Sequence, residues 1–245
     1  MNSRLAFAFV AFSFALVTSQ AGELTETQKR AEFVKAYASA KPEDRVAAVQ
    51  LLKGTKEPTS KSFLTRVAST DLEPSVRLAA FLLISDWEDT QGKLEPVVLE
   101  LFRNEKNRAN KISMLQTFPK LKTKAAATEE AIKFFCTFTY PATYEGGGGN
   151  DGGDGGGGGG GGGPATGRRS KEEIEALRKD FSDVLAVVNT LTGQSFPTSE
   201  KAHEQSKKWW ALNKGDFLKA DAAMLIKLRD EAQAASKQAT TETKQ

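Results

Sequence analysis

The residue types that carry most enzyme and metal chemistry are scarce in this sequence. It has one histidine, His203, and one cysteine, Cys136, among 245 residues. A zinc site needs three or four converging ligands. A serine nucleophile would need that histidine as its base and a G-x-S-x-G turn, which the sequence lacks. We therefore predict a protein that is not an enzyme and has no metal or cofactor site, with His203 on a solvated helix surface.

The cysteine is expected to be structural. Cys136 lies in the apolar run Phe134-Phe135-Cys136-Thr137-Phe138. A cysteine in such a run commonly packs as a small buried hydrophobic residue. A single cysteine also has no partner for an intramolecular disulfide. The fold must therefore rest on its apolar core.

A glycine tract is the most unusual segment of the chain. Residues 146–163 are glycine apart from Asn150, Asp151 and Asp154. The start of the tract matches the G-G-x-G-x-D-x-U-x calcium repeat, but Gly153 stands where that repeat needs an aliphatic residue. No Gly-Lys-Ser/Thr follows to make it a phosphate loop. So much backbone freedom favours a flexible tether over a ligand site.

Two adjacent tryptophans are the weak candidates for a binding site. Trp209 and Trp210 could form a stacking platform for a sugar or a peptide. Neighbouring residues on a helix point about 100° apart, so one of them can pack in the core while the other lies at the surface. The sequence favours packing. The alternative is a carbohydrate-binding or enzyme-accessory unit that combines the pair with acidic side chains such as Asp86, Glu88 and Asp89.

The N-terminus has the pattern of a secretory signal peptide. Arg4 precedes an almost unbroken apolar run over 5–17, and Ser-Gln-Ala at 19–21 fits signal peptidase cleavage. The run is shorter than the roughly 20 residues that a membrane-spanning helix needs. We predict a signal peptide at 1–21, an exported chain in the periplasm or outside the cell, and no stable membrane insertion after cleavage.

Apolar residues at helical spacing dominate the rest of the sequence. Val76, Ala79, Ala80 and Leu83, for example, follow the i, i+3, i+4, i+7 pattern of an amphipathic helix. The predicted helices before the glycine tract cover 25–39, 42–53, 59–69, 73–87, 93–104, 107–118 and 124–138. This pattern predicts an all-α fold.

The segment after the tract also reads as helical. Ser170 and Glu173 form a capping box that opens a long helix, and Gly193 closes it. A last helix is expected over 216–235.

An internal repeat suggests how the first helices are arranged. Residues 45–51 and 77–83 superpose at a spacing of 32, and a weaker third copy begins at Arg108. A period of this length with two helices per unit is typical of α-solenoids. An irregular helical bundle is the alternative.

Two segments resemble a known family. The string Asp71-Leu72-Glu73-Pro74-Ser75-Val76-Arg77-Leu78-Ala79-Ala80 resembles the D-x-x-P-x-V-R-x-x-A signature of the second helix of a HEAT repeat. The segments 191–196, LTGQSF, and 207–214, KKWWALNK, are similar to the closing segment of exported bacterial HEAT-repeat proteins. The resemblance implies a stack of HEAT-like helix pairs with a C-terminal cap, and it implies no catalytic residues.

The sequence predicts five successive segments. The expected divisions are a signal peptide at 1–21, a HEAT-like helical domain at 22–144, a disordered glycine-rich linker at 145–169, a C-terminal helical cap at 170–235 and a frayed tail at 236–245. With 34 basic and 31 acidic residues, the charge gives no reason to expect a nucleic-acid partner. We expect an exported scaffold that binds a protein; a purely structural envelope role is a further alternative, and the oligomeric state stays open.

Overall fold

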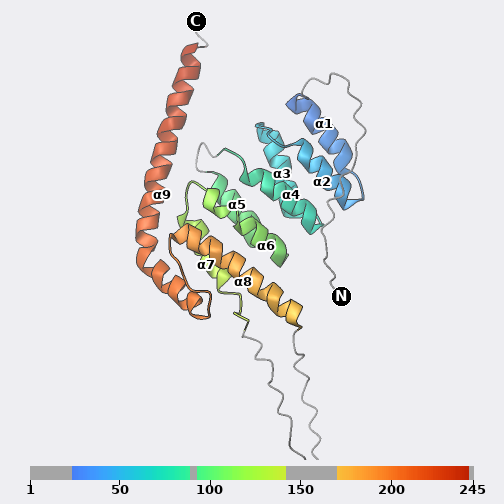
Figure 1. Ribbon diagram of the computed structural model, residues 1–245. Helices are drawn as coiled ribbons and strands as arrows, with labels where there is room; N and C mark the ends of the chain where they lie inside the picture. The colour runs from blue at the N-terminus through green and yellow to red at the C-terminus, as the bar shows by residue number, and fades with distance from the viewer. Residues whose placement is uncertain (1–23, 89–92, 142–169, 243–245) are drawn as a thin grey trace, which may run out of the picture.

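The computed structural model describes residues 24–88, 93–141 and 170–242 (Figure 1). Within these ranges all regular secondary structure is helical, which confirms the all-α prediction. The helices are α1 (Glu26–Tyr37), α2 (Pro42–Leu51), α3 (Pro58–Thr70), α4 (Pro74–Ser85), α5 (Leu94–Asn104), α6 (Arg108–Leu115), the short 3₁₀ helix η1 (Phe118–Lys120), α7 (Ala125–Phe135), α8 (Lys171–Thr192) and α9 (Lys201–Glu242). The predicted signal peptide and the glycine-rich linker lie outside the described residues.

The first eight α-helices stack as pairs. α1 packs on α2, α3 on α4, α5 on α6, and α7 on α8. The second helices of the pairs, α2, α4, α6 and α8, contact one another in sequence order, and so do α3, α5 and α7 (Figure 1). α1 joins the row of first helices through the rings of Phe33 and Phe63, whose centroids are 5.7 Å apart. The result is a two-layer stack with its apolar core between the layers.

α8 continues the stack across the glycine tract. It packs on α7 as that helix's partner and on α6 as the next second helix. Its buried residues include Phe181, Val184 and Val188. The sequence left open whether the C-terminal helices dock on the first part of the chain, and the structure places them against it.

Local sequence signals explain where the helices begin and end. Pro42, Pro58 and Pro74 occupy the first helical turn of α2, α3 and α4, where the missing amide costs no hydrogen bond. The predicted capping box at Ser170 is present. Gly193 ends α8 with a φ of 67°, a left-handed conformation that glycine adopts without strain.

The prediction of a separate last helix from 216 to 235 is wrong. α9 is one helix of 42 residues that runs through Gly215. A glycine inside a helix costs about 1 kcal/mol relative to alanine. Packing on both sides of Gly215 offsets this cost, because the Phe217 ring lies 5.7 Å from Trp209 and 5.3 Å from Trp210 between centroids.

Two arginines tie successive pairs together. Arg45 and Arg77 are the fourth residues of α2 and α4, and each donates from Nη1 to two carbonyls of the turn before its own helix. Each also binds the carboxylate in the equivalent turn of the next pair. Arg45 binds Asp71 with two N–O distances of 3.1 Å, and Arg77 binds Glu105 at 2.7 and 2.9 Å. The repeated arginine is therefore a bond between neighbouring repeats.

The third copy of the repeat lies three residues later than the sequence suggested. The fourth residue of α6 is Lys111, and Arg108 is the first. Lys111 donates to the backbone oxygen of Arg103 at 3.4 Å, and its Nζ lies 5.1 Å from the centroid of the Phe102 ring. Arg108 instead places its guanidinium 3.9 Å from the centroid of the Phe138 ring. The basic position is kept, but the spacing has changed from 32 to 34 residues.

Candidate binding pocket at Trp87

The predicted tryptophan pair lies in a packed region. Trp210 is 8% exposed, and Trp209 is half-buried. Both rings meet Phe217 edge-on, and Trp209 also meets Phe196 with a centroid distance of 6.4 Å. These contacts hold the start of α9 against the turn after α8, so they favour the packing interpretation over a stacking platform.

The third tryptophan lines a pocket. Trp87 follows α4, and Asp86 and Glu88 on either side of it line the same pocket. The sequence had grouped these two acidic residues with Trp209 and Trp210, but neither of those tryptophans lines this pocket. Asp89, the other acidic residue of that group, lies outside the described residues.

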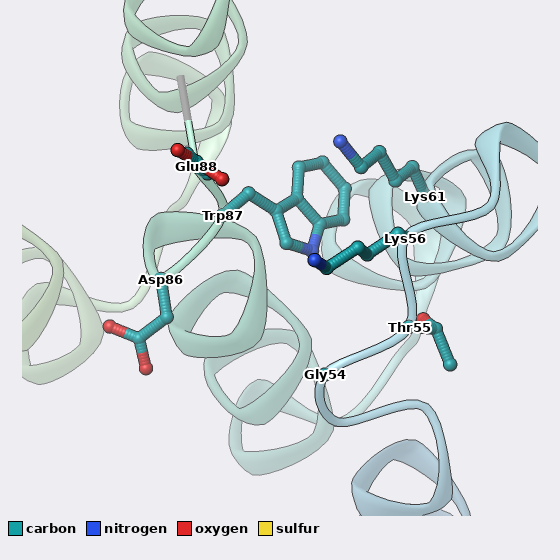
Figure 2. A pocket seen from close by; sticks show the side chains of 7 residues that line it. All are labelled: Gly54, Thr55, Lys56, Lys61, Asp86, Trp87 and Glu88. Atoms are coloured by element: carbon teal, nitrogen blue, oxygen red, sulfur yellow. The ribbon is translucent and has the colours of Figure 1, made fainter. Parts of the chain in front are cut away.

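The pocket lies between the turns of two neighbouring helix pairs. Its volume is about 320 Å³, and its lining residues are Gly54, Thr55, Lys56, Lys61, Asp86, Trp87 and Glu88 (Figure 2). The first three come from the turn between α2 and α3, Lys61 from the first turns of α3, and the last three from the turn after α4. The pocket therefore depends on the stacking of successive pairs.

Hydrogen bonds within the turn and from α1 fix the α2–α3 turn. Gly54 adopts a φ of 73°, where a side chain would strain the backbone. The Thr55 hydroxyl donates to the backbone oxygen of Leu52 at 2.8 Å. The carboxylate of Glu26 on α1 accepts the amides of Lys56 and Glu57 at 2.9 and 3.1 Å. This side of the pocket is thus preformed.

Positive charge faces the indole. The Nζ atom of Lys61 lies 5.1 Å from the centroid of the Trp87 ring, within cation–π range. Figure 2 shows the Lys56 and Lys61 side chains extending toward the indole from the α3 side. The carboxylates of Asp86 and Glu88 lie on the other side of Trp87 (Figure 2).

Neither carboxylate of the pocket forms an ion pair with its lysines, and the Glu88 carboxylate has no ion-pair partner in the described residues. Asp86 pairs with Lys120, with an N–O distance of 2.9 Å. Among the residues that the structure describes, neither Lys56 nor Lys61 has an ion-pair partner. The pocket thus offers a flat apolar surface beside two ammonium groups. This chemistry suits a ligand with an anionic group next to an apolar or planar part.

The 32-residue repeat could have indicated the position of this pocket. Gly54 and Asp86 are 32 residues apart, which is the repeat spacing. Equivalent turns of a solenoid lie side by side, so Lys56 and Trp87 could have been placed together from the sequence. The directions in which these two side chains point could not have been predicted from the sequence.

The histidine is not on a solvated surface, so that prediction is wrong. The His203 ring packs 4.5 Å from Phe135 and 5.4 Å from Phe181 between centroids. Burial, followed by the nearby charge of Lys207, lowers the pKa of His203. The missed signal is the buried stripe of Ala202 and Ser206 beside it, which makes this part of α9 an inward-facing helix.

The cysteine is half-buried at the end of α7. Burial raises the pKa of the Cys136 thiol, although Lys207 acts in the opposite direction. A raised pKa reduces the fraction of reactive thiolate at neutral pH. This environment fits the predicted packing role.

The described residues contain neither a metal-binding cluster nor a helix that could cross a membrane. In that part of the chain, no group of three or more His, Cys, Asp and Glu side chains is arranged to hold a metal ion. None of its helices combines the length and the apolar character that crossing a bilayer requires.

Comparison of the chain with protein-family models, curated proteins and solved structures gave no match.

Proposed function

We propose that this chain is an exported, non-enzymatic scaffold of HEAT-like repeats that binds a protein partner, and that the Trp87 pocket recognises an acidic segment of that partner. The observation that carries the proposal is the pair of lysines, Lys56 and Lys61, which flank an indole without a carboxylate partner in the described residues. The cleavage pattern after Ala21 supports export.

The chemistry of the pocket favours a peptide that combines charge with an apolar side chain. Each ammonium group can donate a charge-assisted hydrogen bond to a carboxylate, and such a bond contributes about 1.5–3 kcal/mol. An apolar or aromatic side chain of the same peptide would cover the indole of Trp87. Because the pocket joins two helix pairs, a bound segment would cross the stack at its turn edge, as partners of repeat proteins use continuous surfaces.

A fluorescence titration tests this proposal. The probe is a glutamate-rich peptide that contains one phenylalanine and no tryptophan, and the matched control peptide carries glutamine in place of glutamate. We expect the glutamate peptide to change tryptophan emission saturably, and the effect to weaken with added salt. In Trp87→Phe the change should disappear, because Trp209 and Trp210 lie elsewhere.

The same titration separates the alternatives. An oligosaccharide rich in uronic acids that changes the emission of Trp87, while the acidic peptide does not, would replace the protein-binding proposal with a carbohydrate-binding one. Silence with both probes in a correctly folded protein would contradict a binding role for this pocket and favour a structural one.

A further inference from the structure

One side of α9 carries an exposed row of three apolar residues that ends at Arg229. Leu218, Ala222, Leu225 and Arg229 follow one another at spacings of four, three and four residues, which places them on one side of the helix. Leu218 is 51% exposed and Leu225 is 39% exposed. Ile226, beside the row, is 58% exposed. A row of this kind is the surface that one helix presents to another.

The side of α9 next to this row is already in use. Asp221 accepts the amides of Lys124 and Ala125 at the start of α7, at 2.8 and 2.7 Å. Lys214 forms an ion pair with Glu129 of α7 at 2.6 Å. These contacts lie in the first half of α9. Asp221 is three residues after Leu218 and four before Leu225, so the stack covers the side next to the row and leaves Leu218 and Leu225 partly exposed.

The second half of α9 continues beyond the α7 contact (Figure 1). At 1.5 Å per residue, a helix of 42 residues is about 63 Å long. Leu228 in this half is 2% exposed, but Leu225, Ile226 and Arg229 around it are exposed. A helix whose apolar side chains are only partly covered gains stability from further packing. A second helix along its apolar row would provide the missing packing.

The positions of two charged residues beside the row indicate which helix could pack on it. Lys219 follows Leu218 in the sequence, and Asp230 follows Arg229. Each charged residue is therefore rotated by about 100° around the helix axis from its neighbour in the row, and both are rotated in the same direction. When two identical helices pair antiparallel about a two-fold axis, residues on one flank of the first helix lie beside residues on the same flank of the second. A register that sets Ala222 against Leu225 of a second copy then brings Lys219 next to the second copy's Asp230.

Both charges are available for such a pair. Asp230 forms no ion pair with the described residues. Lys219 pairs with Asp216 at 3.3 Å, but their side chains are 81% and 80% exposed, so this bond contributes little. In the same register the aliphatic part of Arg229 covers Leu218 of the other copy.

We infer that α9 is a dimerisation helix that pairs antiparallel with α9 of a second copy, centred on Ala222 and Leu225. This arrangement sets the second half of each α9 against the docked first half of the other. The two stacks then lie toward opposite ends of the helix pair. The inference does not depend on what the Trp87 pocket binds.

Light scattering after size-exclusion chromatography tests the inference on the purified, processed chain. We expect twice the monomer mass, and a monomer for Leu218→Glu/Leu225→Glu. Leu72→Glu is the matched control: Leu72 is 94% exposed and lies before α4, so its variant should remain a dimer. Circular dichroism of each variant checks that the helical content of the stack is kept.

A charge exchange tests the register. Lys219→Glu should weaken the dimer by about tenfold in dissociation constant, and Lys219→Glu/Asp230→Lys should restore it. A wild-type chain that is monomeric at tens of micromolar would overturn the inference. A dimer that survives Leu218→Glu/Leu225→Glu would also overturn it. A dimer that the leucine variants disrupt, but that the double charge variant does not restore, would contradict the antiparallel register.

Discussion

Charged side chains serve two different purposes at the turns of this stack. Arg77 and Glu105 are bound to each other, and their side chains are only 16% and 1% exposed. Lys56 and Lys61 face the Trp87 pocket without a carboxylate partner in the described residues. Paired, buried charges hold neighbouring repeats together, whereas unpaired charges beside an apolar surface are available to a ligand. We therefore expect substitutions of Arg77 and Glu105 to affect stability, and substitutions of Lys56 and Lys61 to affect binding.

The largest expected effect is the loss of an arginine between repeats. Arg77→Ala would leave the Glu105 carboxylate buried without its main partner, and breaking a buried pair in this way costs about 3–5 kcal/mol. Unfolding by urea, followed by circular dichroism, measures the change. Arg77→Lys should recover part of it, because a lysine keeps the charge but not both hydrogen bonds. A loss below about 1 kcal/mol would mean that the repeats do not depend on this pair.

Stability should also fall at acidic pH because of Glu105. Burial alone would raise the pKa of Glu105, but hydrogen bonds from Arg77, the amide of Asn107 and Asn110 lower it from 4.5 to about 2. A carboxylate with a lowered pKa stabilises the fold above its unfolded value, and this stabilisation is lost as the pH falls.

We therefore expect the free energy of unfolding to decrease between about pH 4.5 and pH 2. Measurement of urea midpoints across this range checks the trend. Glu105→Gln should flatten the curve in this window, and an unchanged slope would assign the pH dependence to other carboxylates.

A smaller effect is expected at the first junction. The Tyr37 hydroxyl donates to Asp71, which also binds Arg45. Tyr37→Phe removes one hydrogen bond to a charged group, at a cost of about 1.5 kcal/mol. Burial, then the bond to Asp71, raises the pKa of Tyr37 to about 12. Alkaline titration followed by absorbance should therefore find one tyrosine that ionises late, and an ordinary pKa for all tyrosines would contradict this contact.

The smallest effect on stability is expected at the pocket. Lys56→Gln should change the free energy of unfolding by less than about 0.5 kcal/mol, because substitutions of exposed side chains without partners rarely do more. Lys61→Gln should cost up to about 1 kcal/mol, because Lys61 is half-buried and also loses its cation–π contact with Trp87. Thermal unfolding monitored by circular dichroism provides the comparison with Arg77→Ala. A large loss at either lysine would show that the pocket is part of the structural framework.

The sequence predicted elements whose signals are local. The helices that begin at Pro42 and Pro74, the capping box at Ser170 and the cap at Gly193 follow from the preferences of single residues. The continuity of α9 through Gly215 was not predicted, because it depends on how Phe217 packs against Trp209 and Trp210 across the glycine.

The site depended on information that is not local. The 32-residue repeat could place Trp87 near Lys56. Only the ion pairs of the folded chain decide which charged side chains have no partner. Asp86 pairs with Lys120, 34 residues later, and this pairing cannot be read from the sequence. His203 was misplaced for the same reason, since Phe135 and Phe181 approach it from two other helices.

We propose that the unpaired lysines of the Trp87 pocket bind an acidic ligand. The most direct test of this proposal is the dissociation constant of the glutamate-rich peptide, measured by calorimetry for the wild type and for Lys56→Gln/Lys61→Gln. The control is Lys53→Gln, an exposed lysine of the same turn that does not line the pocket. We expect at least about tenfold weaker binding for the double variant, or about 1.4 kcal/mol, and wild-type affinity for the control. Equal affinity for all three proteins would contradict the proposal.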